Sequence, residues 1–347
     1  MKILHTADIH LKNYKDENWE TLQNLIQIGR KEEIDIFVIS GDLFDKKGSS
    51  GELYPKLRPI LNENDFDVII LPGNHDEDAF GLNMFFGDKV KIIRDLMEPI
   101  EYDSVRIFGM PFKKTGSSEV RSEIRKITDI AEVDKVNILL FHGELLDHSF
   151  TRDDYGPEEG RYMGVRLSYF ENLNLKYILA GHFHTNFQIY EFPPESYFIY
   201  PGSPISITKK ETGKRSINLF EVGKSPKQYH IISPYYEKIE IILSPNSKKE
   251  PVKMIEEEVE KIPKEAKILL SVKGYTERDE EEIHKEIKEF VKKEGRIELE
   301  DSLRGIKNIL EDELFKSFNE RLKGLNQPRE EEIRKLFIEG MIQVSLE

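Results

Sequence analysis

Five short segments of this chain are rich in Asp, His and Asn, and each follows closely after a short apolar run. An apolar run that gives way at once to polar residues is typical of a buried strand that presents side chains at the carboxyl edge of a parallel sheet. One such segment has an ordinary structural explanation, but five in succession predict an α/β protein with a functional site at its strand ends. The apolar runs are 3–4, 36–39, 68–71, 138–141 and 177–180, and the polar segments are 8–10, 41–45, 73–76, 142–144 and 181–184.

The polar segments supply imidazole nitrogens, carboxylate oxygens and one amide oxygen, and the chain contains no cysteine. These are the ligands of hard to borderline divalent metal ions. Two ions about 3.5–4 Å apart repel each other, so a carboxylate must lie between them. The seven predicted ligands are Asp8, His10 and His184 for one ion, Asn74, His142 and His182 for the other, and Asp42 as the bridge.

A water or hydroxide between two such ions would have its pKa lowered towards neutrality and could attack a phosphoester. His75 lies beside the predicted ligand Asn74 and precedes Asp76. A neighbouring carboxylate orients an imidazole and favours its protonated form, so His75 and Asp76 are predicted to be catalytic. His75 would stabilise the transition state or protonate the leaving oxygen. The alternative, that His75 only packs, stays open.

Length and composition narrow the remaining possibilities. A chain of 347 residues predicts two or three domains. The absence of cysteine fits a reducing compartment, and together with abundant Lys and Glu it predicts a thermophile. The chain starts on a strand-like run, and no apolar run reaches the roughly 18 residues of a membrane span. We therefore predict a cytoplasmic protein. A net charge of −14 opposes tight binding of long DNA without a partner, although two bound dications would reverse the local sign.

The hydrophobic pattern divides the chain into three predicted parts. Residues 1–235 alternate strand-like and helix-like stretches, and four β-like runs between 187 and 232 are expected to form a second, antiparallel sheet packed on the first. Residues 236–301 form a small α/β unit with helices near 250–261 and 279–293. Residues 302–347 form a helix–loop–helix, because apolar residues recur at helical spacing on both sides of a break at 324–328.

Two apolar stripes are open to two interpretations. The stripe of the tail either packs on this chain or docks on a partner, in which case Phe337 and Met341 would be the main anchors. A second stripe either fills the core or pairs with a second copy of the chain in a homodimer. Its members are Leu53, Tyr54, Leu57, Leu61, Leu82, Met84, Phe85 and Phe86.

The polar segments resemble the pattern D-x-H, G-D, G-N-H-[DE], H and G-H-x-H of the calcineurin-like metallophosphoesterases. Residues 4–11, 41–45 and 200–204 are also similar to the SbcD or Mre-eleven type of DNA double-strand-break repair nuclease. The resemblance implies a two-sheet metallophosphoesterase sandwich flanked by helices, with a small α/β capping domain and a C-terminal helix–loop–helix.

The same resemblance implies an activity and a set of partners. The implied activity is that of a nuclease with two Mn²⁺ per chain, which acts as an exonuclease on DNA ends and as an endonuclease on single strands. The capping domain would contact DNA, the tail would bind an SbcC-type (Rad-fifty-type) coiled-coil ATPase, and the chain would form a homodimer. Many family members have His where this chain has Asp45, which leaves the balance of the two activities open. The alternatives are a phosphoesterase acting on small molecules or phosphoproteins, and a non-enzymatic scaffold for the ATPase.

Overall fold

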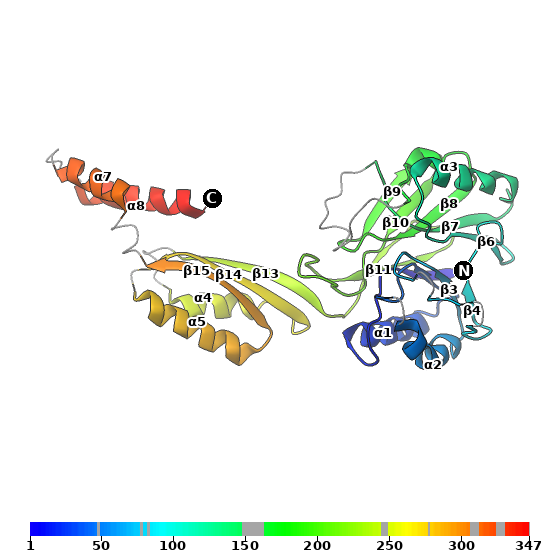
Figure 1. The fold of residues 1–347 in the computed structure, drawn as a ribbon, viewed down its shortest axis with the longest axis horizontal. Helices are drawn as coiled ribbons and strands as arrows, with labels where there is room; N and C mark the ends of the chain where they lie inside the picture. The colour runs from blue at the N-terminus through cyan, green and yellow to red at the C-terminus, as the bar shows by residue number, and fades with distance from the viewer. Residues whose placement is uncertain are drawn as a thin grey trace. The chain divides into compact units, whose positions relative to one another are not determined.

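The computed structural model describes residues 1–46, 49–76, 79–81, 84–147, 163–243, 249–276, 278–305, 312–323 and 330–346. The chain separates into two compact units, Met1–Tyr235 and Tyr236–Glu347 (Figure 1). Among the helices in the described part of the chain, none is both long and apolar enough to cross a bilayer.

The first sheet of the N-terminal unit contains three of the strands that precede polar segments. Its order is β12-β11-β1-β2-β3-β4. The strands β1 to β4 pair in parallel, and β11 pairs antiparallel with both β1 and β12. Their bounds are β1 Lys2–Thr6, β2 Ile36–Ser40, β3 Asp67–Leu71, β4 Val90–Ile92, β11 Ser216–Glu221 and β12 Gln228–His230.

The second sheet contains the other two such strands, and its order is β5-β6-β7-β8-β10-β9. The prediction that residues 187–232 form a second, antiparallel sheet is wrong. The strands β9 and β10 join the mainly parallel second sheet, whereas β11 and β12 extend the first, because sheet partners are chosen by long-range pairing that local pattern does not encode. The bounds are β5 Ile100–Glu101, β6 Val105–Met110, β7 Val136–His142, β8 Leu175–Gly181, β9 Gln188–Phe192 and β10 Ser196–Tyr200.

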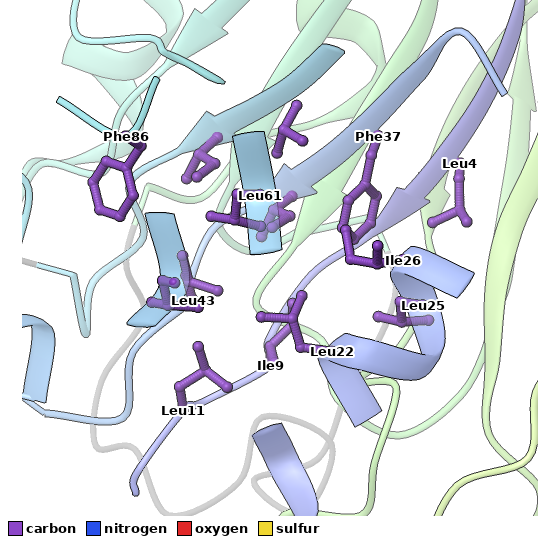
Figure 2. Close-up of a cluster of buried hydrophobic side chains, with 14 of the residues drawn as sticks. Leu4, Ile9, Leu11, Leu22, Leu25, Ile26, Phe37, Leu43, Leu61 and Phe86 are labelled. Carbon is purple, nitrogen blue, oxygen red and sulfur yellow. The ribbon is translucent and has the colours of Figure 1, made fainter. Parts of the chain in front are cut away.

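The two sheets pack face to face between helical layers, which confirms the predicted α/β two-sheet fold class. Successive residues of β2 show the layering: Ile36 and Val38 contribute to the core between the sheets, and Phe37 and Ile39 to the core under the helices. The helices of that layer are α1 (Glu17–Lys31) and α2 (Ser49–Asn62), and α3 (Ser117–Arg125) covers the second sheet. Figure 2 shows Leu22, Leu25 and Ile26 of α1 facing Phe37 and Leu4.

The stripe that predicted a homodimer lies largely in this chain's own core. Leu53, Leu57, Leu61 and Phe86 are buried against the first sheet and its neighbours, and Tyr54 and Met84 are partly buried there. Among the described members of the stripe, only Phe85, at 54% exposure, presents a large apolar side chain to solvent. Leu82 lies outside the described residues. The stripe therefore does not by itself require a second copy of the chain.

The C-terminal unit contains a three-stranded sheet with the order β13-β14-β15, in which β14 and β15 are parallel. The strands are β13 (Tyr235–Leu243), β14 (Ala266–Thr276) and β15 (Ile297–Gly305), and the helices α4 (Pro251–Val259) and α5 (Glu280–Glu294) pack on them. Helix α5 begins where the Asp279 side chain accepts a hydrogen bond from Glu282 N, and it ends at Gly295, whose φ is 71°.

Two further helices complete this unit, α7 (Glu313–Lys323) and α8 (Glu330–Leu346). Residues 306–311 of the predicted helix–loop–helix and its break at 324–328 lie outside the described residues. The Phe337 ring stacks on Phe318 at a centroid distance of 3.7 Å, and Met341 packs on the buried Phe315. The two expected docking anchors thus face the neighbouring helix of their own chain. Among the side chains of these helices that the structure describes, the exposed large apolar ones are Leu314, Leu336 and Val344.

Candidate metal centre

The candidate site lies where strand ends of both sheets meet. Asp8, Asp42 and Asn74 follow β1, β2 and β3 of the first sheet, whereas His142 and His182 come at the ends of β7 and β8 of the second. Carboxyl ends of parallel strands meet at one edge of a sheet, and here two such edges face each other. The sequence predicted the strand ends, and the structure adds that two sheets share the site.

Asp8, His10 and His184 form the first cluster. Each can offer a ligand atom such that all three atoms lie within 4.8 Å of one another. His184 Nε2 lies 3.6 Å from Asp8 Oδ1 and 3.4 Å from His10 Nε2, and all three side chains are buried. Two imidazoles and a carboxylate at this spacing suit a divalent ion.

Asp42 lies between this cluster and a second one. Its Oδ2 is 3.3 Å from His142 Nε2 and 3.8 Å from His10 Nε2, so one carboxylate oxygen faces both clusters. The ligand atoms of Asp8, Asp42 and His142 also lie within 4.8 Å of one another, and Asn74 Oδ1 lies 2.9 Å from His142 Nε2. This placement is the one a bridging carboxylate needs.

His182 lies beside the second cluster. Its ring centroid is 5.3 Å from that of His142, and its backbone N–H donates to the Asp8 carboxylate at 3.0 and 3.1 Å. Among the described residues, three groups of side chains bring their ligand atoms within 4.8 Å of one another, and the His182 ring belongs to none of them. The third of those groups contains His75 together with His10 and Asp42.

The backbone at the site adopts conformations that are rare for residues with a side chain. Asp8, His10, Asp42 and His182 have φ values of 56°, 50°, 54° and 91°. Left-handed backbone at a non-glycine residue costs about 1 kcal/mol or more, and it persists where surrounding structure holds it, often at functional sites. The strain falls on four of the seven predicted ligands.

Glycines of the motifs make room for the ligands. A Cβ on Gly73 would lie 2.2 Å from Asp42 Oδ1, and one on Gly41, whose φ is 99°, would lie 1.9 Å from His142 Nδ1. No side chain fits at either position without displacing a predicted ligand. The glycines that precede Asp42 and Asn74 in the sequence therefore have a packing reason within the site.

Burial and neighbouring charge shift the pKa values of the site strongly. Burial raises the pKa of Asp8 to about 6, partly offset by His184 and His142. Burial alone would also raise the pKa of Asp42, but the nearby His142, His10 and His75 hold it well below its usual range. Burial alone would lower the pKa of His142, but Asp42 raises it to about 10. An ion entering this site must displace the His142 proton, so its affinity should fall as the pH falls.

The buried imidazoles and carboxylates fit a pair of divalent ions. Ionised groups are costly to bury unless they are paired or coordinate a metal. Six of the seven predicted ligands are buried, and only Asn74 is of intermediate exposure. The donor set of nitrogen and oxygen atoms is the one expected for such ions.

The contacts of Asp76 differ from the expectation that it orients the His75 ring. The buried Asp76 carboxylate accepts hydrogen bonds from the backbone N–H groups of Gly73, Leu43 and Phe44, at 3.0, 3.2 and 2.9 Å. His75 Nδ1 instead lies 2.7 Å from the Asp45 carbonyl oxygen. Asp76 therefore ties two ligand-bearing loops together, and the Asp45 carbonyl orients the imidazole.

Asp45, Glu211 and Arg215 were not among the predicted site residues. The Asp45 carboxylate lies 3.8 Å from His10 Nδ1, and that of Glu211 lies 3.5 Å from His184 Nδ1. The motif at 200–204 was the available signal, because Ser203 N donates to His184 O at 3.0 Å. Glu211 and Arg215 follow that motif along the same connection to β11.

A two-sheet α/β sandwich with a buried Asp/His cluster at its strand ends defines the class of metallophosphoesterases. Residues 1–186 match the family described as Calcineurin-like phosphoesterase, and the chain belongs to that family.

Individual relatives support the predicted resemblance to SbcD-type nucleases. The chain is 28% identical over 272 residues to the D subunit of the SbcCD nuclease of Staphylococcus saprophyticus, a match that covers 69% of this chain and 67% of that protein. It is 26% identical over 245 residues to the protein of the same name from Staphylococcus epidermidis, covering 62% of this chain and 64% of that protein. The matches thus span about two thirds of these relatives. Among solved structures, the protein TT1561 of Thermus thermophilus matches 66% of this chain and 98% of its own, at 14% identity and a TM-score of 0.44.

Proposed function

We propose that this chain is a DNA nuclease that uses two Mn²⁺ ions to hydrolyse phosphodiester bonds, at DNA ends and in single strands. The observation that carries the proposal is the position of Asp42 Oδ2 between His142 and His10, which suits a carboxylate that bridges two ions. The similarity to proteins named as SbcCD nuclease subunits favours DNA as the substrate.

When bound, two divalent ions would neutralise the charge of the phosphodiester and supply an activated water. Asp8, His10 and His184 would hold one ion, Asn74, His142 and His182 the other, and Asp42 would hold both. His75 would act on the substrate. Its Nδ1–H donates to the Asp45 carbonyl, so the proton that His75 would give to the leaving oxygen would come from Nε2.

A comparison of substrates tests this function against the small-molecule alternative. The purified chain with Mn²⁺ should cleave end-labelled duplex and circular single-stranded DNA, with and without the coiled-coil ATPase. Bis(p-nitrophenyl) phosphate and phosphomonoesters serve as small substrates. Efficient turnover of a phosphomonoester with no cleavage of DNA would overturn the DNA assignment and favour the alternative.

A hollow beside the site supports a polyanionic substrate. It has a volume of about 680 Å³ and shares Gly73 and Asp76 with the site. Three cationic residues line it, Arg94, Lys113 and Lys114, although the chain as a whole has a net charge of −14. We propose that phosphates of the strand flanking the scissile bond lie along these side chains, since phosphate contacts supply most non-specific affinity for DNA.

Reversing two of these charges should therefore weaken DNA binding more than small-substrate cleavage. For Lys113→Glu with Lys114→Glu, we expect affinity for duplex DNA to fall by about tenfold or more at low salt, with a shallower salt dependence. Turnover of bis(p-nitrophenyl) phosphate should stay within about twofold. Lys126→Glu with Lys224→Glu is the charge-matched control outside the hollow. If both double variants lost DNA affinity equally, the effect would come from the change in net charge, and the hollow would have no specific role in binding DNA.

The proposed function also assigns roles to the C-terminal unit and to a second copy of the chain. We propose that the α/β portion of Tyr236–Glu347 contacts DNA, that α7 and α8 bind an SbcC-type ATPase, and that two copies of the chain associate. The similarity to proteins named as D subunits of the SbcCD nuclease supports the ATPase partner and the DNA substrate, and the association of two copies follows from the family resemblance. In the tail, Leu336 and Val344 are 62% and 76% exposed and lie eight residues apart on α8, as an apolar docking surface requires.

Charged substitutions separate docking from internal packing in the tail. We expect Leu336→Glu with Val344→Glu to abolish co-purification with the ATPase while leaving the melting temperature and DNA cleavage of the isolated chain unchanged. Phe337→Glu with Met341→Glu is the contrast, because it places charges in the contact between α7 and α8 and should disrupt the helix pair. Wild-type recovery of the complex by the Leu336/Val344 variant would refute this docking surface.

A further inference from the structure

A buried charged network lies outside the seven predicted ligands. Glu211 is fully buried and Arg215 is 3% exposed, on the connection between β10 and β11. Ionised side chains are costly to bury unless they are fully hydrogen-bonded or paired. The bonding partners of Glu211 and Arg215 therefore indicate which part of the structure these two residues hold in place.

The Glu211 carboxylate is itself held rigidly. Its Oε2 accepts from Ile207 N at 2.7 Å and from Ser203 Oγ at 3.3 Å, and its Oε1 accepts from Thr208 N and Oγ1, both at 3.2 Å. One of these oxygens, Oε1, also lies 3.5 Å from His184 Nδ1. The loop therefore presents a fixed acceptor to one nitrogen of this imidazole.

Arg215 and Ser203 hold the backbone around the same histidine. Arg215 donates to the His184 carbonyl through Nη2, to Thr185 O through Nη1 at 2.8 Å and to Ser203 O through Nε at 3.0 Å. Ser203 N donates to His184 O at 3.0 Å. The backbone of His184 is thus fixed by residues of one connection, and the same connection places Glu211 Oε1 3.5 Å from Nδ1 of its side chain.

We propose that Glu211 is a positioning residue that acts through His184. Its carboxylate accepts the Nδ1–H proton, which fixes the ring orientation and leaves Nε2 unprotonated towards Asp8 and His10. A ligand histidine whose second nitrogen donates to a carboxylate is both oriented and more basic, and loss of that partner lowers metal affinity by about 10- to 100-fold. Glu211 would therefore set the affinity of the ion shared by Asp8, His10 and His184. This inference rests on the proposed two-ion site.

Metal titration of the full chain tests the proposal. We expect Glu211→Gln to weaken one of two Mn²⁺ sites by about 10- to 100-fold in calorimetry, and to leave the other within about threefold. Asp67→Asn is the matched control, because Asp67 also bonds side chains, Lys91 and Tyr102, but lies at the opposite end of β3 from the site. Wild-type affinity at both sites in a folded Glu211→Gln protein would overturn the proposal. Equal weakening of both sites, with a lower melting temperature of the metal-free protein, would reduce Glu211 to a structural role.

NMR spectroscopy of the wild-type protein tests the contact between Glu211 and His184 even if the Glu211→Gln variant does not fold. In Zn²⁺-loaded wild-type protein, the His184 Nδ1–H proton should give a downfield NMR signal that exchanges slowly with solvent. In Glu211→Gln the signal should move upfield. A His184 Nδ1–H that exchanges as fast as that of an exposed histidine in the wild type would refute the contact. If the wild type binds fewer than two ions, the proposed function fails, and this measurement in the metal-loaded protein still judges the Glu211 contact separately.

Discussion

Asp42→Ala should lose both metal ions and all measurable phosphodiester cleavage while keeping its fold. Its Oδ2 lies within 4 Å of a nitrogen from each cluster, His142 at 3.3 Å and His10 at 3.8 Å. Without that charge, two ions would face each other unscreened. The fold should tolerate the change, because the lost bond from His75 N to Oδ1 is worth about 1 kcal/mol and because His142 can release its proton once the Asp42 charge that raises its pKa is gone.

Metal content and melting temperature measure this result together. The wild type should bind two equivalents of Mn²⁺ in a titration, and the variant should bind neither tightly. Asp42→Asn is the isosteric comparison, because it keeps an oxygen acceptor and removes the charge. A wild-type titration that ends at one equivalent would exclude the two-ion mechanism. A variant that retains both ions would exclude Asp42 as the bridge.

His75→Ala should retain both ions and lose about 10²-fold or more of the DNA cleavage rate. The ring is held by the Asp45 carbonyl at 2.7 Å and lies 4.7 Å from the His10 ring, so it borders the first cluster. A group that donates a proton only in the transition state affects turnover and leaves ligand binding unchanged. General acids of this kind contribute typically 10²–10⁴-fold.

Single-turnover cleavage and metal content distinguish this role from ligation. His230→Ala, at an exposed histidine on β12, is the control and should cleave DNA at the wild-type rate. His75 also forms a possible metal cluster with His10 and Asp42. If His75→Ala loses an ion together with its activity, His75 is a ligand. If it cleaves DNA normally, it has no catalytic role.

Local pattern was sufficient for the helices and strands with strong periodicity. The predicted helix at 279–293 corresponds to α5, Glu280–Glu294, because Ile283 and Ile287 share a face and Asp279 and Gly295 mark its ends. Each predicted strand end carries the expected polar segment. These features depend on residues close together in the sequence, so the sequence alone contains them.

For the apolar stripes of the tail and of the predicted dimer interface, the local sequence pattern could not predict what covers them. An apolar stripe records that a face is covered, but it does not say by what. Phe337 is covered by Phe318 of the same chain, and Leu57 by the first sheet. Choosing between a partner and the chain's own core required the positions of segments far apart in the sequence.

The kinds of ligand at this site and their places at strand ends follow from the local sequence, because a buried strand followed by polar residues is a local pattern. That the edges of two different sheets share the site is apparent in the three-dimensional fold alone. The fold alone placed Glu211 and Arg215 behind His184, and Asp76 on the backbone of its neighbouring loops. The reason is physical: sheet pairing and buried polar contacts join residues that lie tens to hundreds of positions apart, and no local spacing specifies such partners.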